Sequence, residues 1–95
     1  MDNSSKFKDF FQEQMQNQEF RTEYEALELE KNIIKAFADA RKISGITQKE
    51  LSIKTGIGQG DISKIENGNA NPSLRTLRRL ASGMGMKIKL EFVPA

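Results

Sequence analysis

Glycine is unevenly distributed along the 95-residue chain, since all seven glycines lie between Gly45 and Gly85. Glycine ends helices and forms turns, so this distribution predicts long helices before Gly45 and short helices separated by turns after it. Four of the six phenylalanines lie within the first 20 residues. We therefore expect the N-terminal helices to carry large apolar side chains.

The spacing of apolar residues predicts three helices before the first glycine. The first ends at about Gln16, the second spans about residues 18–28, and the third ends at Gly45. The apolar positions of the second and third helices are in phase, which leaves open whether the two form one continuous helix.

Three short helices are predicted after Gly45. The first begins at Thr47, which has the capping-box spacing to Glu50, and ends at Gly56. The second begins at about Gly58, and the third is capped by Ser73.

Residues 86–92 alternate between apolar and charged side chains, which is typical of a half-buried strand. A single strand must pair with another backbone. Antiparallel self-pairing centred on Leu90 places Lys89 opposite Glu91 and Ile88 opposite Phe92, which are favourable pairs. We therefore predict a homodimer through Ile88, Leu90 and Phe92. Pairing with the sheet of a partner protein, or a lid over the chain's own helices, are the alternatives.

The composition excludes several kinds of chemistry. The chain has no cysteine and no histidine, so we expect no thiol nucleophile, no imidazole base, no zinc or haem site and no cofactor. A metal site made only of oxygen ligands, or a carboxylate acid–base pair, is the alternative that the composition leaves open. No apolar run is long enough for a membrane span, and the N-terminus lacks the apolar stretch of a signal peptide. We expect a cytoplasmic protein that binds other molecules and is not an enzyme.

The net charge of +2 is the sum of two dissimilar parts. Residues 1–30 contain three basic and eight acidic residues, a net charge of −5, and residues 31–95 contain twelve basic and five acidic residues, a net charge of +7. A basic body is typical of proteins that bind phosphate backbones, whereas an acidic arm suits a basic protein partner. The alternative is that both charge runs are simply solvated helix faces.

Residues 47–80 resemble the Xre/Cro-repressor helix-turn-helix family. The matching residues are Thr47, Gln48, Leu51, Gly56, Ile57, Ile62, Ser63, Ile65, Glu66, Gly68, Pro72, Ser73, Leu74, Thr76 and Leu77. The resemblance implies an all-α fold of five to seven short helices with a lambda-repressor-like core, to which the N-terminal helical arm and the single C-terminal β-strand are added. It also implies an internal ion pair between Arg41 and Glu66.

In this family, the helix that begins after Gly58 enters the major groove of double-stranded operator DNA. The DNA-binding residues implied here are Gln48, Lys49, Gln59, Gly60, Asp61, Ser63, Lys64, Asn69 and Arg75. Arg78 and Arg79 either add contacts to the DNA backbone or form a solvated face. Gly58 replaces the usual Ser or Thr cap, and Gly60 is a second poor helix former. We therefore expect modest affinity for the monomer and a reliance on dimerisation.

Residues 19–28 resemble the arm of HigA-type antitoxins, and residues 71–77 and 86–94 are similar in the same group. These antitoxins bind a RelE/HigB-like, mRNA-cleaving toxin and repress their own operon. The resemblance suggests toxin binding through Phe7, Phe10, Phe11, Met15, Phe20 and Tyr24. For Phe20 and Tyr24, packing within the antitoxin itself is at least as good an interpretation.

Three parts follow from this reading of the sequence. Residues 1–30 form an acidic toxin-binding arm, residues 31–85 a DNA-binding domain, and residues 86–95 a dimerisation strand. The alternative function is a stand-alone, prophage-type transcriptional repressor whose arm packs only on itself.

Overall fold

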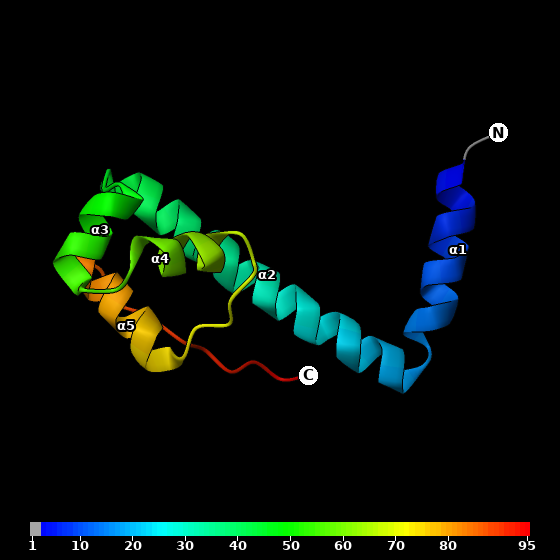
Figure 1. Cartoon of the computed structure of the whole chain (residues 1–95). Helices are drawn as coiled ribbons and strands as arrows, with labels where there is room; N and C mark the ends of the chain where they lie inside the picture. The colour runs from blue at the N-terminus through cyan, green and yellow to red at the C-terminus, as the bar shows by residue number, and fades with distance from the viewer. Residues whose placement is uncertain (1–2) are drawn as a thin grey trace. The chain divides into compact units, whose positions relative to one another are not determined.

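The computed structural model describes residues 3–95, and the side chains from Ser5 onward. The described residues form five α-helices and no β-strand (Figure 1). The helices are α1 (Asn3–Met15), α2 (Gln18–Ser44), α3 (Gln48–Thr55), α4 (Gln59–Glu66) and α5 (Leu74–Gly83). The predicted all-helical fold is confirmed. The question left open around Leu29 is also answered, because α2 is a single helix of 27 residues.

The chain divides into two compact units, Met1–Asn32 and Ile33–Ala95. The first unit contains α1 and the beginning of α2, joined by a turn at Asn17. The side chain of Asn17 accepts a hydrogen bond from the amide of Phe20 (3.2 Å), which caps the start of α2.

An aromatic cluster holds this helical hairpin together. The ring of Phe11 in α1 lies 5.0 Å from that of Tyr24 and 6.5 Å from that of Phe20, both edge-on. These separations are those of favourable aromatic pairs. The three rings are half-buried.

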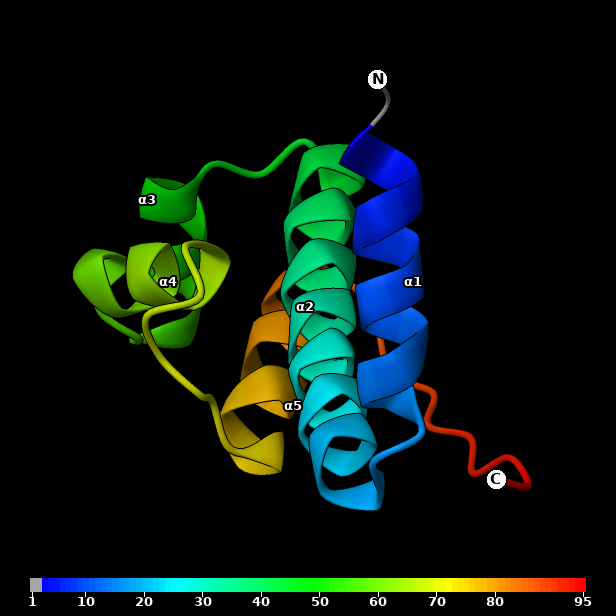
Figure 2. The ribbon, with the colours of Figure 1, turned by 90° about the vertical axis from the view of Figure 1, so that its right-hand side faces the viewer.

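The second unit contains the rest of α2 and helices α3 to α5, with α3 next to α4 (Figure 2). Helix α3 also packs against α5. The core of this unit consists of seven buried apolar residues, namely Phe37, Ile46, Leu51, Ile62, Ile65, Leu80 and Ala81. No polar side chain of the described residues is buried. A core this small leaves most of the side chains of the unit on the surface.

Side-chain caps fix the starts of two of the short helices. The hydroxyl of Thr47 accepts from the amide of Glu50 (3.0 Å), and that of Ser73 accepts from the amide of Thr76 (3.1 Å). Both predicted caps are therefore confirmed. Gly58 precedes α4 and makes no side-chain cap, because glycine has no side chain.

The predicted C-terminal strand is wrong for the single chain. Residues 86–95 have no regular secondary structure, because no other described segment supplies the backbone partner that a strand needs. The amide of Met86 donates to the carbonyl of Ala81 (2.8 Å), and residues 86–90 form one side of an apolar groove against α2 and α5. Residues 86–90 thus lie against the chain's own helices, which was the alternative to pairing with a second strand.

Candidate nucleic-acid interface

Helix α4 has one buried side and one exposed side. Ile62 has no exposed surface and Ile65 is 3% exposed, and both side chains belong to the core of the second unit. The residues on the other side of the helix then face solvent. The side chains of Gln59, Asp61 and Lys64 are exposed, as is Gly60, and Ser63 is half-buried.

The turn between α3 and α4 is fixed by a left-handed glycine and by hydroxyl groups. Gly56 has φ of +74°, a conformation that side chains disfavour. Its amide donates to the carbonyl of Ser52, and the hydroxyl of Ser52 donates to the carbonyl of Ile57 (2.6 Å). The hydroxyl of Thr55 donates to the carbonyl of Leu51 (2.7 Å) and accepts from the amide of Ile57 (3.2 Å). These bonds hold α4 at a defined angle to α3.

An ion pair connects α4 to α2, as the family resemblance implies. Glu66 accepts from Nε of Arg41 through Oε1, and from Nη2 through Oε2 at 3.1 Å. Arg41 also donates to the carbonyl of Ile46 (3.1 Å). The hydrogen bond from Arg41 is the main reason that the pKa of Glu66 is lowered from its usual value. The same bond raises the pKa of Arg41.

Gln48 belongs to the same network. It is the first residue of α3, and its Nε2 donates to Oε2 of Glu66 at 3.0 Å. The family resemblance implied DNA binding by Gln48, but the sequence gave no sign of this bond across 18 residues. One side of the amide of Gln48 is therefore held by the protein.

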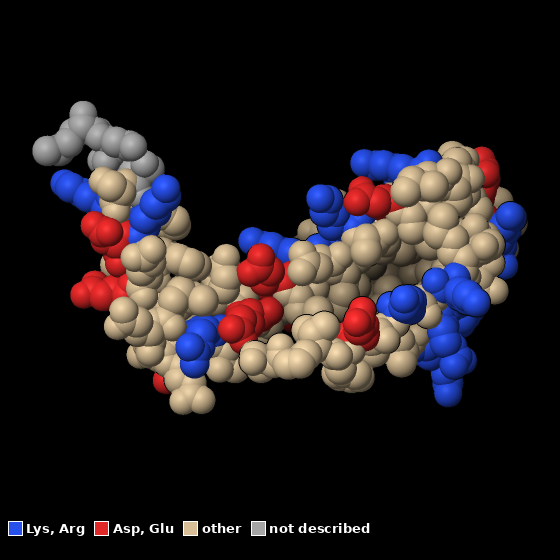
Figure 3. Space-filling model, turned by 180° about the vertical axis from the view of Figure 1, so that it is seen from behind, with Lys and Arg blue, Asp and Glu red and all other residues tan. Residues whose placement is uncertain are grey.

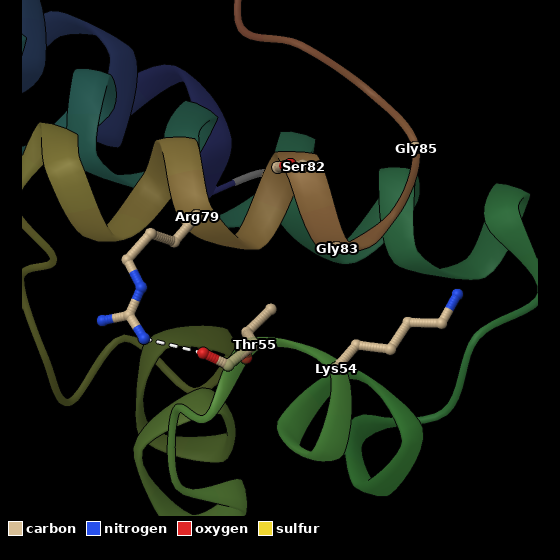
Figure 4. Close-up of a pocket in the computed structure, with 6 residues that line it drawn as sticks. All are labelled: Lys54, Thr55, Arg79, Ser82, Gly83 and Gly85. Atoms are coloured by element: carbon tan, nitrogen blue, oxygen red, sulfur yellow. Dashed lines mark hydrogen bonds between the residues drawn. The ribbon is translucent and has the colours of Figure 1, made fainter.

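Arg79 ties α5 to the end of α3, as Figure 4 shows. Its Nη2 donates to the carbonyl of Thr55 (2.6 Å). Thr55 is the last residue of α3, where the carbonyls have no amide donor within the helix. Arg79 and Thr55 line a surface pocket between α3 and α5, and Lys54 lines it too. The sequence offered DNA contact or a solvated face for Arg79, and did not reveal this bond because the partner is a backbone atom 24 residues away.

The other predicted DNA-binding residues lie on the surface of the second unit. Lys49 is exposed in the first turn of α3, Asn69 follows α4, and Arg75 is exposed in the first turn of α5. The backbone N–H of Asn69 donates to the backbone carbonyl of Lys64 (2.8 Å) just after the end of α4. No hydrogen bond joins the side chains of these three residues to those of α4 in the part of the chain that the structure describes.

Charge differs between the two units. On the face seen in Figure 3, acidic side chains are spread over the arm, and basic side chains gather over the helix-turn-helix part. Helix α5 carries Arg75, Arg78 and Arg79 and no acidic residue. Such a surface attracts phosphate groups.

The predicted toxin-binding residues fall into two groups. Phe7 is 67% exposed and Phe10 is 59% exposed. By contrast, Phe11, Met15, Phe20 and Tyr24 are half-buried within the described part of the arm. Phe20 and Tyr24 pack against Phe11 within the arm, and toxin binding by these residues stays a prediction.

Two further kinds of site are absent from residues 3–95. No group of three or more acidic side chains lies close enough to hold a metal ion. None of the helices is both long enough and apolar enough to span a membrane.

Comparison with known proteins agrees with this geometry. Residues 37–90 match the helix-turn-helix family, a span that covers α3, the turn and α4. No solved structure matches the chain significantly.

Two curated relatives are similar over most of their length. An uncharacterized HTH-type transcriptional regulator of Haemophilus influenzae is 34% identical over 80 residues, which is 84% of this chain and 79% of the relative. The uncharacterized HTH-type transcriptional regulator y4dJ of Sinorhizobium fredii is 33% identical over 60 residues, 63% of this chain and 78% of the relative. The chain belongs to the helix-turn-helix family.

Proposed function

We propose that the protein is a DNA-binding transcriptional repressor that also acts as the antitoxin of a toxin–antitoxin pair. In its first role, α4 lies in the major groove of operator DNA. The observation that carries this role is the exposed polar side of α4, whose backbone is fixed by the buried Ile62 and Ile65.

The exposed side chains of α4 have the chemistry to distinguish bases. The amide of Gln59 can pair with adenine, the carboxylate of Asp61 can accept from the amino group of cytosine, and Lys64 can donate to guanine. Ser63 and Gly60 bring the backbone close to the groove. Gln48, Lys49, Asn69 and Arg75 then contact phosphates, which fix the position of the protein on the duplex.

The test is a binding titration with DNA from the promoter region upstream of the chain's own gene. We expect Lys64→Ala to weaken binding by about tenfold, the effect of one lost base contact. The matched control is Lys35→Ala, which removes an exposed lysine of α2 that we do not place at the DNA. Equal losses for the two variants would mean that only general charge matters and that α4 does not read the sequence.

In its second role, the arm captures a basic toxin of the RelE/HigB type. The supporting observation is that Phe7 and Phe10 remain exposed although the arm has its own aromatic cluster. Leu27 and Leu29 are also exposed, among the acidic residues of α2. Exposed apolar side chains surrounded by carboxylates are complementary to a basic protein with an apolar groove.

The antitoxin role is tested by coexpression with the reading frame next to this gene. We expect Phe7→Ser with Phe10→Ser to abolish neutralisation of the toxin, while the fold and DNA binding persist. Ile53→Ser, which replaces an exposed apolar residue of α3 outside the arm by serine, is the control. Full neutralisation by a protein that lacks residues 1–17 would contradict this role.

We also propose that two copies bind the operator together. Leu90 and Phe92 are 69% and 92% exposed, and Ile88 is 39% exposed, so these apolar side chains are accessible to a second copy. Light scattering of the Leu90→Asp variant tests this contact, since an unchanged dimer would exclude it.

A stand-alone repressor is the second candidate. It is favoured by the names of the two relatives, which mention transcription only, and by the packing of Phe11, Phe20 and Tyr24 within the arm. A neighbouring reading frame for a short basic protein supports the antitoxin, and its absence supports the stand-alone repressor.

A further inference from the structure

The side chain of Glu66 connects three helices through hydrogen bonds. Glu66 lies at the end of α4 and accepts hydrogen bonds from Arg41 of α2 and from Gln48 of α3. Its side chain is only 12% exposed, and that of Arg41 is 16% exposed. The ion pair alone explains why a carboxylate tolerates this position, so the bond to Gln48 is an additional feature.

The chemistry of the carboxylate determines how the amide of Gln48 is oriented. An ionised carboxylate can only accept hydrogen bonds, so the nitrogen of the amide must face Glu66 and the oxygen must face away. Because Arg41 lowers the pKa of Glu66, the carboxylate is ionised at neutral pH. One N–H of Gln48 is used by Glu66, and the second N–H is left for another acceptor.

We propose that Glu66 is a positioning residue for DNA binding, acting through Gln48. By holding one N–H of the amide, it fixes the second N–H in place for a phosphate of the DNA backbone. Without Glu66, the side chain of Gln48 rotates freely and must lose that freedom each time DNA binds. This inference rests on the proposed contact between Gln48 and DNA.

Charge and positioning predict opposite effects for the removal of Glu66. Loss of a negative charge near DNA strengthens binding if charge alone matters. Loss of positioning weakens it. Glu50→Ala is the matched control for charge, because Glu50 is an exposed carboxylate in the first turn of α3.

The experiment measures binding to a short mixed-sequence duplex for the wild type, Glu66→Ala, Gln48→Ala and the double variant. We expect Glu66→Ala to weaken binding about three- to tenfold, the range for one hydrogen bond, and to have no further effect when Gln48 is already alanine. Glu50→Ala should leave binding unchanged or strengthen it. If the wild type does not bind the duplex at all, the proposed function fails, whereas a wild type that binds without this coupling refutes only the role of Glu66.

A second variant removes the carboxylate without leaving Arg41 unpaired. Arg41→Met with Glu66→Met replaces the ion pair by apolar side chains, an exchange that proteins often tolerate. In this background, we expect Gln48→Ala to change the affinity much less than in the wild type. If Gln48→Ala lowers the affinity equally in the wild type and in this background, the proposal is overturned. It is also overturned if Glu66→Ala lowers the affinity equally whether residue 48 is glutamine or alanine.

Discussion

The replacement of Gly83 by alanine is a stringent test of how α5 packs against α3. A Cβ atom at Gly83 would lie 2.6 Å from Cγ2 of Thr55 and 2.9 Å from Cδ1 of Leu51. Neither neighbour can move easily. Leu51 has no exposed surface, and Thr55 is held by the two hydrogen bonds of its hydroxyl to Leu51 and Ile57.

The expected magnitude is a balance of two terms. Overpacking of a well-packed site costs about 1–3 kcal/mol, and replacing a helical glycine by alanine returns up to about 1 kcal/mol. We therefore expect Gly83→Ala to lower the free energy of unfolding by up to about 3 kcal/mol, with about 1–2 kcal/mol at the middle of the range. In a unit of this size, each kcal/mol corresponds to a fall of roughly 4–8 °C in Tm, which differential scanning calorimetry resolves.

Two further variants test this explanation. Thr55→Ser deletes the methyl group that meets the new Cβ and keeps the hydroxyl, so Gly83→Ala should cost clearly less in that background. Gly60→Ala is the matched control, since a Cβ there meets nothing within 4 Å, and it should raise Tm. An equal cost for Gly83→Ala with Thr55 and with Ser at this position would refute the steric argument.

Four other predictions follow from the described contacts. Thr47→Ala should lower the free energy of unfolding by about 1 kcal/mol in urea titrations, because it removes the cap of α3. Since the folded-state pKa of Glu66 lies below the usual 4.5, its stabilisation is present above about pH 4.5 and is lost as the pH falls through the folded-state value. The Tm should therefore fall more steeply below pH 4.5 in the wild type than in the Arg41→Met, Glu66→Met protein. Arg75→Gln should reduce the slope of log affinity against log salt by about 0.9, as expected for one lost phosphate contact. Phe11→Ala should reduce the helicity of the arm in circular dichroism, whereas Phe10→Ala should not, because the ring of Phe11 contacts those of Phe20 and Tyr24 in α2 edge-on.

The helix-turn-helix part could be predicted closely because its signals are local. The caps at Thr47 and Ser73, the left-handed turn at Gly56, and the buried positions of α4 are each set by residues a few positions apart. Hydrophobic periodicity then decides which side of α4 is exposed. Which of the exposed residues bind DNA is implied by the family resemblance and does not follow from periodicity.

The rest depends on contacts between residues far apart in the sequence. The bonds of Arg79 to Thr55 and of Gln48 to Glu66 join positions that no local pattern links. The predicted strand at residues 86–92 was wrong for a related reason. Alternation shows that a segment can form a strand, but the strand exists only if a partner backbone is present.

The exposed side of α4 and the exposed phenylalanines of the arm differ in what they require. In the second unit, the exposed side of α4 is polar, so water alone satisfies it in the absence of DNA. In the arm, Phe11 already joins α1 to α2, yet Phe7 and Phe10 stay mostly exposed. Water does not satisfy these side chains, and burying the part of each that is still exposed contributes roughly 1–2 kcal/mol. The arm can therefore release free energy by binding another apolar surface, and its carboxylates favour one that is basic.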